Sequence, residues 1–364
     1  MTLRVIIYRL GVIPLLLLLC ILAACSQQDL DQEEQGMVSL KVLASPGTKA
    51  GEGGTATATL PDKETAIFDL SIFIFNSNGD VIGFTSKDFS DGKPTAVDVK
   101  TRKATGCSVY AVANAKTLNK NGTSPFDGVS TLSVFKTKYL SFTDAKAPND
   151  DKCLLMMGVS SNFDTSSASS ASPAIITLKR LASRIDYTIT VKNDETTKFP
   201  IVVDSYQLCH VPTSTFYQQS DFTNPSMPSS TTFADFDKVS TPISSVAAAT
   251  SSTSAGPYYV YANADPNPDP DPSKETYLDI WAHSEVQGAG GTKYTVWKSN
   301  FRVNMPGNHV LPNYHYKIDI VINGSVTGKN GGVITTYEAY PYFSGSIPTL
   351  NQWQSEPDRN LDLQ

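Results

Sequence analysis

The sequence predicts a mainly β protein, with two β-sandwich domains in tandem and one short helix. Its 16 Tyr and 16 Phe residues, together with many Val and Thr, favour strands over helices. Short apolar runs alternate with turn residues along the chain, which is typical of β-sandwiches. The length of 364 residues corresponds to about two domains, and a hydrophobic content of 40% is enough to form their cores.

Residues 1–24 have the pattern of a signal peptide. Two arginines precede an apolar run over residues 10–22, which is shorter than the roughly 20 residues of a membrane span. The run ends in Leu-Ala-Ala-Cys at residues 22–25, which is similar to a bacterial lipobox. This motif predicts cleavage before Cys25 and acylation of its thiol and its new amino group. The alternative is an ordinary signal peptide followed by a chance cysteine.

The mature chain is acidic. Removing residues 1–24 removes two arginines and no acidic residue, which leaves 27 basic and 35 acidic side chains and a net charge of −8. Residues 25–37 are largely polar and acidic and are interpreted as a flexible tether. A nucleic-acid partner is not expected, because phosphate contacts need a basic surface.

The first domain is expected over residues 38–182. Residues 38–42 alternate apolar and polar side chains, as a half-buried strand does. Asn78-Gly79 separates two apolar runs and is a strong hairpin signal, because both residues tolerate positive φ. Apolar residues spaced by three and four predict the one short helix over 129–140. Further strands are expected over 67–75, 81–84, 109–113, 154–159 and 174–178.

The second domain is expected over residues 183–364, because one run of strands ends and another begins near Ala182 without a long linker. A long loop rich in Ser, Thr and Pro is expected over 211–256. The proline-rich segment 265–272 cannot be a central strand, and its carboxylates are interpreted as a solvated loop rather than a cation site. Strands are expected over 185–191, 201–209, 257–262, 276–286, 292–304, 314–323 and 333–343.

The sequence carries no catalytic motif. The patterns of zinc proteases, serine hydrolases, phosphate-binding loops and dinucleotide-binding folds are all missing. The histidines are interpreted as structural; they are His210, His283, His309 and His315. The cysteines after Cys25 match neither a disulfide framework nor a zinc site, although one disulfide remains open; they are Cys107, Cys153 and Cys209. No enzyme activity, metal or cofactor is therefore expected.

Several motifs follow one another in a set order. The lipobox at Cys25 is followed by a strand over 38–44 and a Gly/Thr-rich loop. A strand over 107–114 then ends in Ala-Asn, and residues 155–158 form a Met-containing strand. The last members are 178–185 at the domain junction, 313–320 in the penultimate strand, and Trp353 in the terminal segment.

This order resembles that of the Bacteroidetes fimbrillins, the subunits of type V pili. The resemblance implies two transthyretin-like β-sandwich domains and a non-enzymatic pilus subunit that supports cell adhesion. It also implies export as a lipoprotein of the cell outer membrane, followed by display in a surface fimbrium; the acidic residues after Cys25 resemble the export signals of such lipoproteins. The implied partners are other fimbrial subunits, including tip and anchor proteins, and the outer membrane through the lipid.

In the fimbrillins, a trypsin-like protease cuts after the first strand, and the C-terminal segment of another subunit fills the gap. The chain has no arginine between Cys25 and Arg102, so Lys49, in a Gly/Pro loop, is the candidate processing site. Either a different protease cuts there, or the subunit is never cut and stays anchored. The donor segment is expected over 333–364, with candidate contacts at Val333, Tyr337 and Trp353.

Two other functions remain open from the sequence. The chain could be a monomeric surface lipoprotein that binds a glycan or a host protein. A secreted hydrolase ranks last, because no motif supports one. The N-terminus of the protein taken from cells separates the pilus subunit from the monomeric binder. A start near Ala50 favours strand removal and polymerisation, whereas a lipidated Cys25 on every copy favours an anchor or a monomeric binder.

Overall fold

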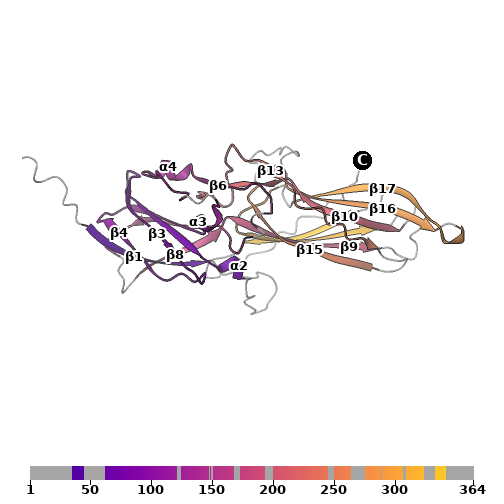
Figure 1. Cartoon of the computed structure of the whole chain (residues 1–364), viewed down its shortest axis with the longest axis horizontal. Helices are drawn as coiled ribbons and strands as arrows, with labels where there is room; N and C mark the ends of the chain where they lie inside the picture. The colour runs from indigo at the N-terminus through magenta and orange to yellow at the C-terminus, as the bar shows by residue number, and fades with distance from the viewer. Residues whose placement is uncertain are drawn as a thin grey trace, which may run out of the picture.

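The computed structural model describes residues 35–44, 62–120, 124–146, 148, 151–167, 173–192, 200–244, 250–263, 275–287, 289–305, 309–323 and 333–341. The molecule is elongated, with the strands of the N-terminal half at one end and those of the C-terminal half at the other (Figure 1). Its helical elements are short; those described are α2 (Asp62–Thr65), α3 (Ala115–Leu118), α4 (Leu132–Lys136) and the 3₁₀ turn η2 (Ala289–Gly291).

The N-terminal strands form a closed barrel around one apolar core. Its centre consists of fully buried side chains such as Leu40, Ile72, Val99 and Val109. Successive side chains point to opposite faces of a strand, so the alternating apolar residues of strands such as β4 all reach this core, whereas β2 and β5 are buried on both faces. The strands, in order around the barrel, are β1 (Gln35–Ala44), β4 (Val97–Arg102), β3 (Val81–Asp88), β2 (Asp69–Phe75), β5 (Cys107–Ala113), β7 (Met156–Phe163) and β8 (Ala174–Arg180).

Glycines lie at the two corners where the barrel is most weakly paired. β3 and β4 are joined by a single residue pair, Gly83 with Thr101. β7 and β8 share only two pairs, and Gly158 lies beside this corner. A Cβ on Gly158 would lie 2.5 Å from the main-chain oxygen of Thr177, and one on Gly83 would lie 3.0 Å from that of Lys100. The close approach of two strands at each corner therefore requires a residue without a side chain.

The β7–β8 corner gives a direct test of this packing. We expect Gly158→Ala to lower the free energy of unfolding by about 1–3 kcal/mol, because the new methyl group meets backbone that cannot move aside cheaply. Gly36→Ala on β1 is the matched control, since its Cβ would lie 3.5 Å from the nearest atom, an ordinary contact. Urea denaturation of both variants measures the difference, and equal midpoints would contradict a tight corner.

The C-terminal strands form two four-stranded sheets that enclose a second apolar core. β9 pairs with β18 in parallel and with β15 antiparallel, so β9 and β18 are the central strands of one sheet. Residues from both sheets, including Ile189, Leu208, Ile280 and Ile320, form the core. The strands of the first sheet are, in order, β14 (Ile243–Ser244), β10 (Ile201–Cys209), β16 (Tyr277–Gln287) and β17 (Lys293–Asn304). Those of the second sheet are β15 (Thr250–Tyr261), β9 (Ala182–Lys192), β18 (Tyr314–Asn323) and β19 (Val333–Pro341).

A third apolar cluster joins the two halves. It begins on the outer faces of β2 and β5 and continues to Tyr259 and Tyr261 of β15. The rings of Phe126 and Tyr217 lie 5.0 Å apart, which links the N-terminal half to a loop of the C-terminal half. The short pair β6 (Tyr139–Ser141) with β12 (Ser214–Phe216) lies beside this cluster, which includes Leu140. A second short pair, β11 (Val211–Pro212) with β13 (Phe233–Ala234), packs against the C-terminal core, which includes Val211.

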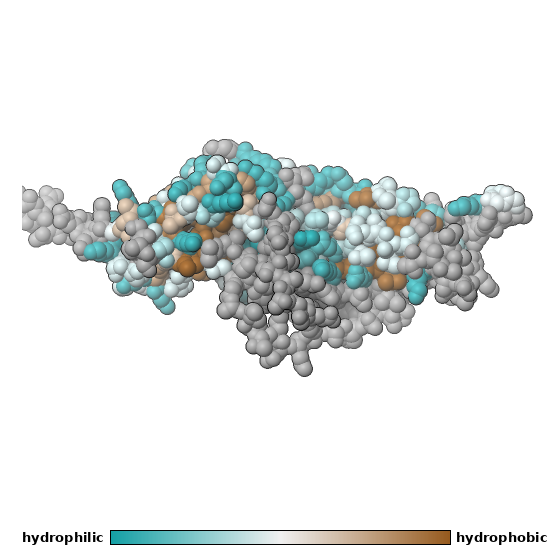
Figure 2. Space-filling model, turned by 90° about the horizontal axis from the view of Figure 1, so that it is seen from below, coloured by the Kyte–Doolittle hydropathy of each residue, from teal (hydrophilic) through white to brown (hydrophobic). Residues whose placement is uncertain are grey.

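The exposed surface is mixed in character. On the face shown in Figure 2, apolar residues form small patches between hydrophilic ones. The large apolar side chains that are exposed are single residues on different strands, such as Met37 on β1 and Ile175 on β8. Within the described ranges, none of the helices has the length and apolar character needed to cross a membrane.

The structure confirms the mainly β class and most of the expected strands, including the hairpin at Asn78-Gly79, where Gly79 has a φ of 87°. The short helix expected within 129–140 is confirmed as α4, although it is shorter than expected; the expectation of a single helix is wrong, because α2 and α3 are also present. The expected loop over 211–256 contains β11 to β14 and the start of β15. β8 ends and β9 begins on either side of Leu181, next to the expected boundary; the division into two domains stays a prediction.

Candidate functional site

β1 lies between two neighbouring strands of the barrel wall, β4 and β8. It pairs antiparallel with β4 over six residues, from Gln35 with Arg102 to Leu40 with Val97. It pairs in parallel with β8 over five residues, from Leu40 with Ala174 to Ala44 with Leu178. β1 therefore supplies hydrogen bonds to strands on both sides, although it is the first strand that the structure describes.

One face of β1 packs into the barrel core. Val38, Leu40 and Val42 are at most 2% exposed. On the opposite face of β1, Met37 is 53% exposed and Lys41 is exposed, whereas Ser39 is buried. Complete burial of a side chain of this size contributes roughly 1.5–3 kcal/mol, so the three inward residues hold β1 firmly. Without β1, the backbone groups of β4 and β8 would lose their partners and the core would open along a groove.

The last described strand lies at a sheet edge. β19 pairs with β18 over nine residues, and Val333 and Tyr337 lie opposite Ile322 and Ile318. Among the described strands, β19 has β18 as its one neighbour, so its removal would not divide the sheet. The other residues predicted for assembly, Cys25, Lys49 and Trp353, lie outside the described residues, as does the proline-rich segment 265–272.

The described cysteines and histidines do not form a reactive site. Cys107, Cys153 and Cys209 are buried free thiols. Burial raises the pKa of Cys153 and of Cys209 to about 12, which leaves both thiols protonated near neutral pH. Two histidines bond aspartates instead: His283 Nδ1 lies 2.9 Å from Asp204, and His315 Nε2 lies 2.5 Å from Asp186. The residues that the structure describes contain no cluster of three side chains suited to hold a metal ion.

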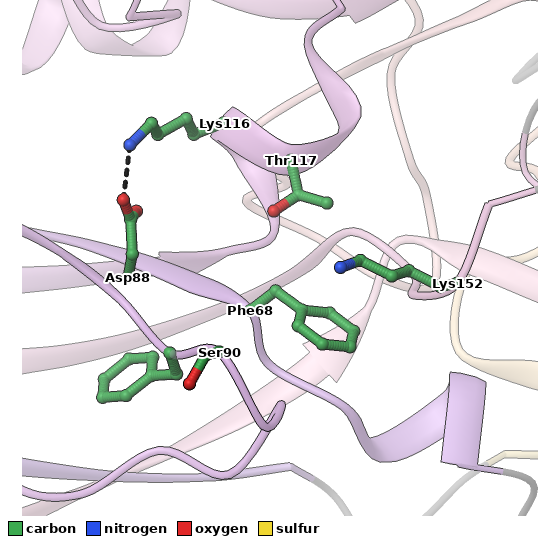
Figure 3. Close-up of a pocket in the computed structure, with 7 residues that line it drawn as sticks. Phe68, Asp88, Ser90, Lys116, Thr117 and Lys152 are labelled. Carbon is green, nitrogen blue, oxygen red and sulfur yellow. Dashed lines mark hydrogen bonds and ion pairs between the residues drawn. The ribbon is translucent and has the colours of Figure 1, made fainter.

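An open pocket of about 490 Å³ lies where β2 begins and β3 ends (Figure 3). Lys116 and Asp88 form an ion pair of 2.6 Å across it, and both side chains are more than half exposed, so the pair contributes little to stability. The ammonium of Lys152 lies 3.7 Å from the ring centroid of Phe68. The described lining of the pocket also includes Ser90 and Thr117 and contains no histidine.

Comparison with known proteins finds a family match for the N-terminal part of the chain. Residues 37–199 match the family described as major fimbrial subunit protein (FimA). No curated protein matches the chain.

Solved structures extend the likeness to most of the chain. A candidate cell adhesion protein from Parabacteroides distasonis is 18% identical, with a TM-score of 0.59, over 87% of this chain and 98% of that one. A fimbrilin (FimA) from Porphyromonas gingivalis is 14% identical, with a TM-score of 0.52, over 85% and 98%. The tip fimbrial protein Mfa3 from the same species, with a C-terminal truncation, is 13% identical, with a TM-score of 0.50, over 84% and 99%. These findings confirm the resemblance seen in the sequence: residues 37–199 match the FimA major fimbrial subunit family, and the fold is similar to that of solved fimbrial and cell adhesion proteins.

Proposed function

We propose that the chain is a structural subunit of a fimbrium, that it is exported as a lipoprotein, and that it polymerises by strand exchange in support of cell adhesion. The single observation that carries the proposal is the position of β1. It is the first described strand, yet it lies between β4 and β8 and packs Val38, Leu40 and Val42 into the core. A cut after β1 would allow it to leave, and an incoming strand could then restore both ladders and refill the core.

Two further features support the proposal. β19, close to the C-terminus, has one neighbour among the described strands, so a neighbouring subunit could take it up at the cost of that single ladder. A contact between the C-terminal segment of one subunit and the N-terminal groove of the next is head-to-tail, and such a contact produces a filament when it does not close into a ring. In this proposal the two halves act as separate domains, with the groove in 38–182 and the donor in 183–364.

The candidate processing site gives the test. We expect trypsin, under native conditions, to cut the mature chain first at Lys49, since the surrounding Gly and Pro residues disfavour packed structure. The cut protein should then form oligomers, because loss of β1 exposes apolar surface and unpaired backbone groups. Light scattering after size-exclusion chromatography measures the oligomers.

Lys49→Gln and Lys41→Gln form the matched pair for this experiment. Lys49→Gln should leave the chain uncut at that loop and monomeric, whereas Lys41→Gln should behave as the unmodified chain, because Lys41 lies within the paired strand β1. A cut chain that keeps β1 and stays monomeric would contradict strand exchange. It would favour a monomeric surface lipoprotein that binds a glycan or a host protein.

A further inference from the structure

Glu64 is a buried carboxylate that lies shortly after β1 in the sequence. It lies in α2, the first described element after segment 45–61, and its side chain is 0% exposed. A carboxylate is rarely buried in this way unless charged or hydrogen-bonding partners compensate for its lost hydration. The groups that surround Glu64 should therefore include such partners.

The partners of Glu64 come from three different strands. Its Oε1 accepts hydrogen bonds from the hydroxyl of Tyr259 at 2.7 Å and from Nη1 of Arg184 at 3.2 Å. Its main-chain oxygen accepts a hydrogen bond from Nε of Arg180 at 2.8 Å. Arg180 ends β8, Arg184 lies on β9 and Tyr259 on β15, so Glu64 ties α2 both to the barrel and to the C-terminal sheet.

A second layer of contacts fixes Arg184. Asp186 accepts from Arg184 Nε at 2.8 Å, and His315 Nε2 on β18 lies 2.5 Å from the same carboxylate. Burial alone would raise the pKa of Asp186, but the hydrogen bonds from His315 and Arg184 outweigh it and lower that pKa. Asp186 is thus ionised at neutral pH and holds the guanidinium in position for Glu64.

The described residues on either side of segment 45–61 contact the same strand, β8. β1 ends at Ala44, which pairs with Leu178 of β8. Two residues further along β8, Arg180 binds the main chain of Glu64. A cut in the segment separates these ends, and their attachments differ: β1 is held by strand pairing and apolar packing, whereas α2 is held by buried polar contacts that β1 does not make.

We propose that Glu64 is a positioning residue for strand exchange: it keeps α2 fixed on β8, β9 and β15 after the segment is cut, so that only β1 leaves the barrel. The inference rests on the proposed function. With α2 fixed, β2 begins from a defined point, and the groove between β4 and β8 keeps its shape for the incoming strand. Without this anchor, the new N-terminal residues up to Thr65 form a longer free end beside the groove, because Ala66 is the first residue that Asn114 holds independently of Glu64.

The role predicts an asymmetry between accepting and donating a strand. A chain with Glu64→Ala, once cut at Lys49, should accept a strand roughly tenfold or more slowly than the unmodified chain, because the remaining partners lose a buried counter-charge. It should still donate its C-terminal segment normally, because Glu64 is remote from 333–364 in sequence and makes no described contact with β19. A general loss of stability would impair both activities.

The measurement uses mixtures of cut chains. The acceptor is a cut chain that lacks 333–364 and can only accept; the donor is uncut Lys49→Gln, which can only donate. Glu64→Ala is introduced into the acceptor to measure accepting and, separately, into the donor to measure donating, and each variant chain is mixed with an unmodified form of the other. Tyr259→Phe is a milder variant in case Glu64→Ala folds poorly, and Tyr258→Phe on the same strand is its control, because no described hydrogen bond joins Tyr258 to Glu64. The rate of dimer formation is followed by light scattering.

The outcomes are distinct. Slow accepting with normal donating, in Glu64→Ala or Tyr259→Phe but not in Tyr258→Phe, supports the proposal. Accepting at the unmodified rate, or an equal loss of both activities, overturns it. If the unmodified cut chain itself accepts no strand, the proposed function fails instead, whatever Glu64 does.

Discussion

Leu40→Asp is expected to prevent the barrel from folding stably. Leu40 is 0% exposed and lies at the centre of β1, where it pairs with both β4 and β8. The substitution removes an apolar side chain from the core and places an unpaired carboxylate there, at a cost of more than about 5 kcal/mol. This is comparable with the whole stability of a typical domain, roughly 5–15 kcal/mol. Near-ultraviolet circular dichroism and urea denaturation measure the loss.

Met37→Asp is the matched control, since it makes the same kind of change on the same strand. Met37 is 53% exposed and points away from the core, so the free energy of unfolding should change by less than about 1 kcal/mol. Equal stability of the two variants would show that β1 is not packed as described. In the strand-exchange account, the effect of Leu40→Asp is confined to the precursor, because an assembled subunit no longer contains residue 40.

Asn114→Ala should be the most damaging change outside β1. Asn114 is 0% exposed and adopts a left-handed conformation, with a φ of 67°. Its side-chain oxygen accepts from the main-chain N–H of Phe68 at 2.8 Å, and its amide donates to the main-chain oxygens of Ala66 and Leu154 at 2.9 and 2.7 Å. Each buried main-chain group left without a partner costs about 1–3 kcal/mol, so we expect a total loss of about 3–6 kcal/mol.

Asn114→Gly separates the loss of the hydrogen bonds from the backbone strain of a positive φ. Glycine loses the same three hydrogen bonds but adopts positive φ without strain, so it should be about 1 kcal/mol less damaging than alanine. Chemical denaturation of both variants measures this difference. If both substitutions leave the denaturation midpoint unchanged, the hydrogen bonds of Asn114 do not organise this region.

The elements that the sequence predicted well are those that depend on local pattern. Alternating residues predicted β1, and Asn78-Gly79 predicted the hairpin between β2 and β3, because period and turn chemistry act over a few residues. The Ala-Asn motif at the end of β5 marked Asn114, but its role depends on Leu154, which is 40 residues away. Contacts at such separations leave no periodic signal.

The same limit explains what the sequence did not indicate. Glu64 lies in the charged stretch Asp62–Thr65, which has the composition of an exposed turn, and its partners Arg184 and Tyr259 are 120 and 195 residues away. The short strands within 211–256 were also missed, because two- or three-residue strands such as β11 and β12 are formed by their pairing partners rather than by their own pattern. The glycines at the barrel corners become meaningful only when Thr177 and Lys100 are known to lie beside them.

The intact mass and N-terminal sequence of subunits in filaments purified from cells test the central claim most directly. The account predicts subunits that begin just after Lys49 and lack the peptide containing β1, because an incoming strand takes its place between β4 and β8. Filaments in which every subunit retains residues 35–44, with lipid on Cys25, would contradict strand exchange at this site.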